Sequence, residues 1–170
     1  MTTSEYVTFF SEWDAEARKT AQLMRSLPPS QYDFRPDPGG RSLGELAWHL
    51  AEIDGYFSHS IETGKFESGG RIPGLERPRT VAELAPGYER AHREAVARLK
   101  KLTPEDFLRT MPFFGGRMLP IGVILWNALL RHMVHHRGQL VLMCRLAGGR
   151  PPGMFGPTRE ESEQAARGKA

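Results

Sequence analysis

The sequence contains one cysteine, Cys144, in 170 residues, so no disulfide can form within the chain. A lone cysteine is typical of proteins in a reducing compartment, and we therefore expect a cytoplasmic protein. No run approaches the roughly 20 apolar residues that a transmembrane helix needs, and the first residues lack the basic and apolar regions of a signal peptide. These absences predict a protein without a membrane partner.

A strong excess of positive charge is also missing. The formal net charge is +3, and the 23 Lys and Arg residues are scattered among 20 Asp and Glu residues. Nucleic-acid-binding proteins usually gather their basic residues on one face or along one helix. The sequence therefore predicts no nucleic-acid partner.

Strand-like alternation is absent over any length that would build a sheet, and apolar residues instead recur at three- and four-residue steps. A chain of this length is sufficient for one hydrophobic core, so we expect a single domain over residues 1–170. The periodicity predicts four helices and a tail, over residues 4–27, 42–63, 80–102, 121–146 and 150–170. Four helices without a sheet predict an all-α four-helix bundle.

Local signals support these boundaries. Ser42, Thr80 and Thr158 each precede a glutamate by three residues, which predicts a capping box at the start of three helices, the last of them a short helix in the tail. Residues 64–79 and 103–120 are rich in proline and glycine and should form loops, the second of which includes a short antiparallel ribbon.

The most informative residues present are histidines. His132 and His136 are one helical turn apart and differ by only about 40° around the axis, so both rings can reach one point. Both lie within the apolar stripe of their helix, whereas His135 lies at its flank. His49 offers a third imidazole from an earlier amphipathic helix, and three such ligands leave coordination positions open, as in catalytic metal sites. The alternative is three hydrogen-bonded core histidines, which would need several buried polar partners.

Three further polar residues are candidates to support this site from outside the ligand set. Gln139 is predicted to point inward from the last helix, where its amide would hold a ligand or a water. Glu45 precedes His49 by one turn and could contact the metal or a ligand, although its place after Ser42 favours helix capping. His92 lies on the apolar stripe of the third helix, where it would either face the same cavity or pack in the core.

Phe113 and Phe114, in the loop over residues 103–120, are candidates to line the mouth of a site, and simple packing against the bundle is equally compatible with the sequence. No second carboxylate is identified as dedicated to proton transfer. The sequence therefore assigns no catalytic acid or base.

Three segments together resemble the DinB/YfiT superfamily: SLGELAWHL at residues 42–50, HMVHHRGQL at 132–140 and PGMFGP at 152–157. The resemblance implies a four-helix bundle of up-down-down-up topology, commonly a homodimer, with a divalent metal on three histidines that match His49, His132 and His136. Characterised members include metal-dependent transferases and isomerases that use low-molecular-weight thiols such as bacillithiol or mycothiol. A small-molecule substrate is therefore expected.

Two hypotheses of function follow. In the first, Zn²⁺ or Ni²⁺ on the three histidines activates a low-molecular-weight thiol or water, as in an S-transferase or a hydrolase. In the second, the same bundle is a non-catalytic binding or scaffold protein stabilised by the metal. Imidazole suits Zn, Ni, Cu and Fe alike, so the ligand type alone does not identify the ion.

Overall fold

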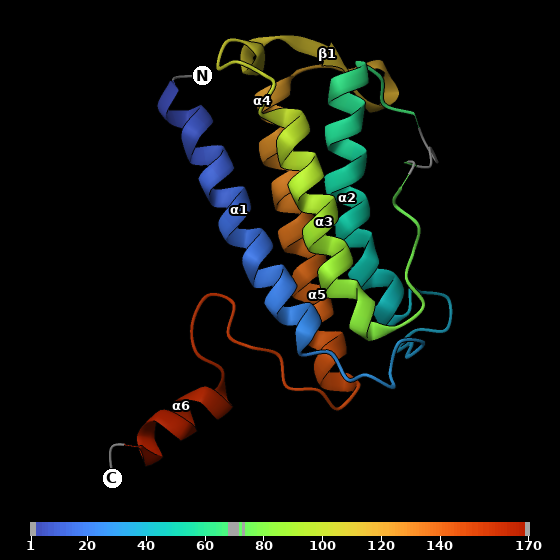
Figure 1. Cartoon of the computed structure of the whole chain (residues 1–170), viewed down its shortest axis with the longest axis vertical. Coiled ribbons are helices and arrows are strands. Elements are labelled where there is room, and N and C mark those ends of the chain that lie inside the picture. The colour runs from blue at the N-terminus through green and yellow to red at the C-terminus, as the bar shows by residue number, and fades with distance from the viewer. Residues whose placement is uncertain (1–2, 68–71, 73, 169–170) are drawn as a thin grey trace.

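Four long helical segments run side by side in the computed structural model, which describes residues 3–67, 72 and 74–168 (Figure 1). The predicted all-α bundle is confirmed, and its helices begin and end close to the predicted residues. The first three segments are α1 (Thr3–Arg25), α2 (Leu43–Thr63) and α3 (Val81–Leu99). The fourth is continuous and consists of α4 (Ile121–Val123), a π-helical stretch η3 (Ile124–Arg131) and α5 (His132–Leu146).

The helices follow the up-down-down-up order (Figure 1). Helices α2 and α3 are parallel to each other. Helix α1 and the fourth segment are antiparallel to them. Helix α3 packs against both α1 and α2, and α5 packs against α2. The α2–α5 contact is the one that positions the histidines.

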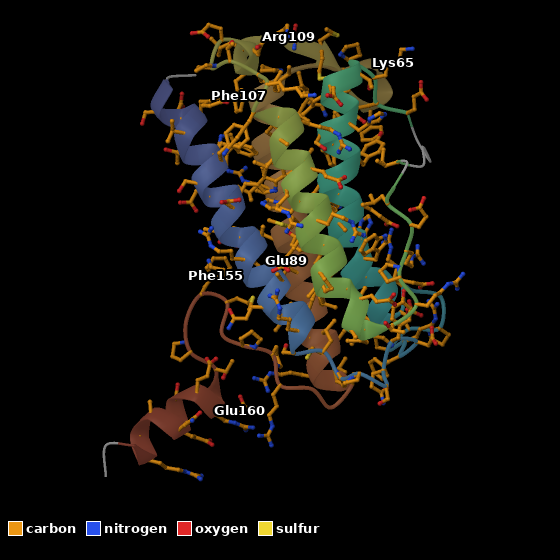
Figure 2. The ribbon with its side chains drawn as sticks, in the orientation of Figure 1. Lys65, Glu89, Phe107, Arg109, Phe155 and Glu160 are labelled. Carbon is orange, nitrogen blue, oxygen red and sulfur yellow. The ribbon has the colours of Figure 1, made fainter. Side chains whose placement is uncertain are left out.

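Aromatic rings fill much of the core between these helices. Trp13, Trp48 and Tyr88 are almost completely buried, and each removes a large apolar surface from water, worth about 2 kcal/mol or more. Trp48 lies against Gly87, where a Cβ atom would approach its ring to 2.8 Å, so glycine allows α2 and α3 to pack closely. Phe107, in the short 3₁₀ helix η1 (Asp106–Leu108), lies at one end of the bundle and closes it against α1 (Figure 2).

Two of the three predicted capping boxes are present. The side chains of Ser42 and Thr158 each accept a hydrogen bond from the backbone of the glutamate three residues later, and each glutamate bonds back. The prediction is wrong at Thr80, whose side chain caps no backbone group and whose hydroxyl donates to the Glu83 carboxylate at 2.6 Å. A side-chain pair has replaced the reciprocal backbone bonds there.

The predicted ribbon is present as strands β1 (Thr110–Pro112) and β2 (Met118–Pro120), with Met111 opposite Leu119. A short turn, η2 (Phe114–Gly116), joins them, and Gly115 and Gly116 there have φ of 70° and 75°, which favours glycine.

The tail carries α6 (Arg159–Arg167), which lies beside the end of the bundle and buries none of its residues (Figure 2). Its main link to α5 is the paired contact between Arg145 and Glu160, at 3.0 and 2.9 Å. No helix among the described residues is long and apolar enough to cross a bilayer.

The π-helical stretch changes which face of the fourth segment enters the core. A continuous α-helix would bury Leu146, but that side chain is 56% exposed, whereas Met133, Arg137 and Cys144 are buried. Bonds from residue i to i+5 in η3 rotate α5 relative to the residues before it, so a single helical wheel does not describe both parts. As a result, the histidines of α5 lie at the edge of the core rather than at its centre.

Candidate metal centre

His49 of α2 and His132 and His136 of α5 meet between the two helices. One nitrogen of each ring lies within 4.8 Å of the others, and all three residues are partly buried. The Nε2 atoms of His132 and His136 are 2.8 Å apart, and the His49 ring centroid is 4.8 Å from that of His136. Two imidazole nitrogens on one ion, each about 2.1 Å from it, are separated by roughly 3.0 to 3.4 Å. The three rings are therefore close to the arrangement that a shared ion requires.

Neighbouring side chains fix which nitrogen of two rings faces the centre. Nδ1 of His49 lies 3.2 Å from the Glu52 carboxylate, and Nδ1 of His136 lies 2.7 Å from Oε1 of Gln139. Both partners are acceptors, so each Nδ1 carries the proton and each neutral ring keeps its Nε2 lone pair. Lone pairs directed at a common point are the donor set that a cation needs.

The surroundings also favour neutral rings. Burial lowers the pKa of His136 to about 4, and the bond with Gln139 only partly opposes this effect. Burial and the charge of His49 likewise lower the pKa of His132. Both rings are therefore neutral at pH 7 and available as ligands without prior loss of a proton.

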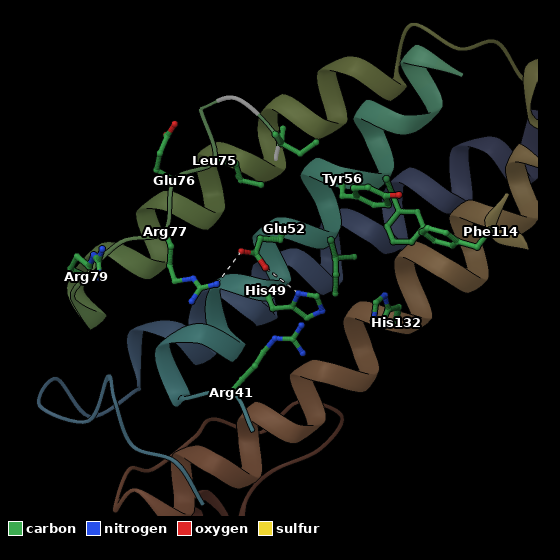
Figure 3. Close-up of a pocket in the computed structure, with 13 residues that line it drawn as sticks. Arg41, His49, Glu52, Tyr56, Leu75, Glu76, Arg77, Arg79, Phe114 and His132 are labelled. Carbon is green, nitrogen blue, oxygen red and sulfur yellow. Dashed lines mark hydrogen bonds and ion pairs between the residues drawn. The ribbon is translucent and has the colours of Figure 1, made fainter. Parts of the chain in front are cut away.

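A pocket of about 950 Å³ opens beside His49 and His132 (Figure 3). Its apolar lining comes from Ile53, Tyr56, Phe57, Ile72, Leu75 and Phe114. Its charged lining comes from Arg41, Glu52, Glu76, Arg77 and Arg79. A small molecule in this pocket would touch both the histidines and an apolar wall.

The candidate supporting residues have different positions. Glu45 caps α2 and pairs with Arg35 at 2.8 Å, and that hydrogen bond lowers the pKa of its carboxyl to about 2. Glu52, which the sequence analysis did not single out, is the carboxylate that contacts His49, and this bond lowers its own pKa. Its spacing of three residues from His49 on one helix face was the available signal.

Gln139 reaches His136, but its side chain is exposed, so the prediction that it is buried is wrong. The reason is the rotation of α5 described above, which moves its residues away from the core centre. Gln139 also contacts Nε2 of His135 at 3.2 Å, and His135 is exposed and lies outside the group of three.

Of the two candidate phenylalanines, Phe114 and Phe113, one lines the pocket and the other packs behind it. Phe114 lines the pocket and is 41% exposed. Phe113 lies behind it, with its ring centroid 4.9 Å from Phe114 and 5.0 Å from Phe66. Only Phe114 is therefore placed to contact a molecule in the pocket.

His92 belongs to a different cluster. Its Nδ1 lies 2.8 Å from Asp54 and its Nε2 lies 3.1 Å from Asp14, while the Trp13 indole donates to Asp54 at 3.1 Å. Burial by itself lowers the pKa of His92, but the bond and charge of Asp54, together with Asp14, outweigh it and raise the pKa. With both nitrogens engaged by carboxylates, His92 does not support the three-histidine group.

The sequence patterns also did not predict a buried ion pair between Arg137 and Glu16. Arg137, within the HMVHHRGQL segment, is 1% exposed, pairs with the Glu16 carboxylate and donates to the Glu16 backbone at 2.9 Å. Burial alone would raise the pKa of Glu16, but bonds with Lys19 and Arg137 lower it. This pair joins α1 to α5 at the residue that follows His136.

Comparisons with known proteins agree with this architecture. The sequence model of the DinB family matches residues 1–168. The chain is 29% identical over 153 residues to the uncharacterized protein YrdA of Bacillus subtilis strain 168, covering 90% of this chain and 89% of YrdA.

Solved structures of DinB-like proteins have a similar fold. A DinB-like protein from Bacillus cereus has a TM-score of 0.72 and 28% identity, covering 86% of this chain and 95% of its own. The DinB-like protein YjoA of Bacillus subtilis, at 24% identity and a TM-score of 0.68, matches 89% of this chain and 99% of its own and supports the fold alone.

Proposed function

Because this chain belongs to the DinB family, we propose that His49, His132 and His136 bind one divalent metal ion and that the protein uses it on a small molecule. The observation that carries this proposal is the convergence of three imidazoles, two of them with Nε2 lone pairs held inward by Glu52 and Gln139. The convergence lies beside a pocket rather than in a closed core. Three protein ligands beside an open space are typical of catalytic metal sites.

The reaction we propose is transfer of a low-molecular-weight thiol, or hydrolysis by water, with Zn²⁺ or Ni²⁺ as the ion. Bound at this site, a divalent ion would lower the pKa of a coordinated thiol or water and so make it nucleophilic at neutral pH. The side chains of this chain orient the ligand rings and shape the pocket. Tyr56, Phe57 and Phe114 exclude water from one side of the reacting group.

Metal content tests the binding step. Protein expressed without an affinity tag that binds metal should contain about one divalent ion per chain, and His136→Ala should lose most of it. His135→Ala is the matched control, because His135 is the adjacent residue on α5 but lies outside the converging group. Equal metal content in both variants would reject the ligand assignment.

Turnover tests the reaction. Metal-loaded protein is incubated with a panel of low-molecular-weight thiols and the electrophile monochlorobimane, and conjugate fluorescence is followed. Conjugation that depends on one thiol and disappears with a chelator would support a transferase. A full complement of metal with no turnover of any thiol, and no hydrolysis, would favour a scaffold protein instead.

A further inference from the structure

Three arginines line the pocket, and they differ in their partners. Arg77 is paired with Glu45 at 3.2 Å and with Glu52 at 3.6 Å. Arg41 and Arg79 form no ion pair or hydrogen bond with any side chain in the part of the chain that the structure describes. The pocket therefore contains guanidinium groups whose donors are available to a ligand.

Arg41 is the arginine directed at the histidines. In Figure 3 the Arg41 side chain extends toward His49, with which it lines the pocket, while Arg79 lies at the other end of the view. Its charge acts on both His132 and Glu52. Because Arg41 directly precedes Ser42, the buried N-cap of α2, the capping box holds its backbone in place. The backbone that carries this side chain is thus held close to the candidate ligands.

The charges around this position call for an anion. The nearby carboxylate of Glu52 is already shared between His49 and Arg77. A divalent ion on the histidines would place further positive charge close to Arg41, and like charges in a partly desolvated pocket repel each other. A ligand that bears a negative group between them would relieve this repulsion. The planar fork of a guanidinium matches a carboxylate by two parallel hydrogen bonds.

We propose that Arg41 binds the carboxylate of a small organic acid that carries a thiol or hydroxyl group, whose sulfur or oxygen takes an open position at the histidine site. The hydrocarbon part of the acid lies against Phe57, Tyr56 and Phe114, which form the neighbouring apolar wall. This inference rests on the proposed metal site and adds the substrate class. It makes Arg41 a determinant of specificity for acidic over neutral ligands.

Two thiols of equal chain length test the inference: 3-mercaptopropionate and 3-mercapto-1-propanol. Each is titrated into the Co²⁺-loaded protein, and binding is read from the change in the cobalt absorption spectrum. Because a hydrogen-bonded charge pair in a pocket is worth about ten- to a hundredfold in affinity, the acid should bind more tightly than the alcohol by that factor. Arg41→Gln should abolish the preference, and Arg41→Lys should retain part of it.

Arg79→Gln is the matched control, since it removes the same charge from the far end of the same pocket. It should leave the preference for the acid intact. If one Co²⁺ binds per chain but the two thiols bind equally, or if the two glutamine variants behave alike, the role of Arg41 is overturned and the metal site stands. If His136→Ala takes up as much Co²⁺ as the unmodified chain, the metal site falls and this inference with it.

Discussion

The bundle contains two histidine sites that are arranged in opposite ways: His92 is buried, whereas His132 and His136 are partly buried. In one, both nitrogens of His92 contact carboxylates, from Asp54 and Asp14, and the pKa of the ring is raised. In the other, His132 and His136 direct Nε2 atoms at each other, and their pKa values are lowered. The comparison shows that burial does not mark a ligand histidine. What distinguishes the candidate ligands is that their Nε2 atoms face another imidazole instead of a carboxylate.

Removal of His92 tests whether its contacts with carboxylates stabilise the fold, and it should have the largest effect on stability. His92→Ala leaves the completely buried Asp54 without its histidine partner, which should cost about 3 kcal/mol in the free energy of unfolding. Urea denaturation of the metal-free protein measures this cost. Metal content should not change, and a loss of metal in this variant would show that the two clusters are not independent.

Replacement of Glu52 tests whether its carboxylate orients His49 for metal binding. Glu52→Ala frees Nδ1 of His49 to rotate or change tautomer, and such changes typically reduce metal affinity about 10- to 100-fold. Competition with a chromophoric chelator gives the affinity. Glu45→Ala is the control on the same helix: it removes the reciprocal bond of the capping box but leaves the Ser42 cap, should cost about 1 kcal/mol of stability or less, and should leave the affinity nearly unchanged. Equal losses of affinity in the two variants would refute the role of Glu52.

The pH dependence of stability gives a smaller but specific signature of His92. Because its pKa is raised on folding, its charged contacts stabilise the protein fully below its unfolded pKa of about 6.5, and this contribution is lost as the pH rises through the folded pKa. The unfolding free energy of the unmodified chain, minus that of His92→Gln, should therefore fall by about 1 kcal/mol from pH 6 to pH 9. A difference that is constant or rises over this range would contradict a charged His92.

Local sequence patterns predicted the helices and the histidines that the structure brings together. The Ser42 box marks the start of α2, and the spacing of His132 and His136 predicts that both rings share one face, which the structure agrees with. The same logic of spacing pointed to Glu45, one turn before His49, whereas the carboxylate that contacts His49 is that of Glu52, three residues after it. Signals of this kind lie within one helix and can be read without knowing how helices pack.

The residues that the sequence patterns misplaced or missed depend on features that no regular single helix contains. The His92 cluster takes Asp14 from α1 and Asp54 from α2, so no single helical pattern contains it. The π-helical turns of η3 rotate α5 and bring Gln139 to the surface, and they leave no recognisable mark in the sequence. Arg41 becomes informative only once the pocket shows which arginines are already paired.

The most direct test is X-ray absorption spectroscopy of the metal-loaded protein at the edge of the bound ion. We expect three imidazole nitrogens at about 2.0–2.1 Å from the ion. We also expect further ligand atoms, whose signal changes when a thiol is added. His136→Ala should reduce the imidazole count to two or abolish binding. A spectrum with three imidazoles that is unaffected by this substitution, or one that fits no imidazole at all, would contradict the convergence of His49, His132 and His136 on one ion.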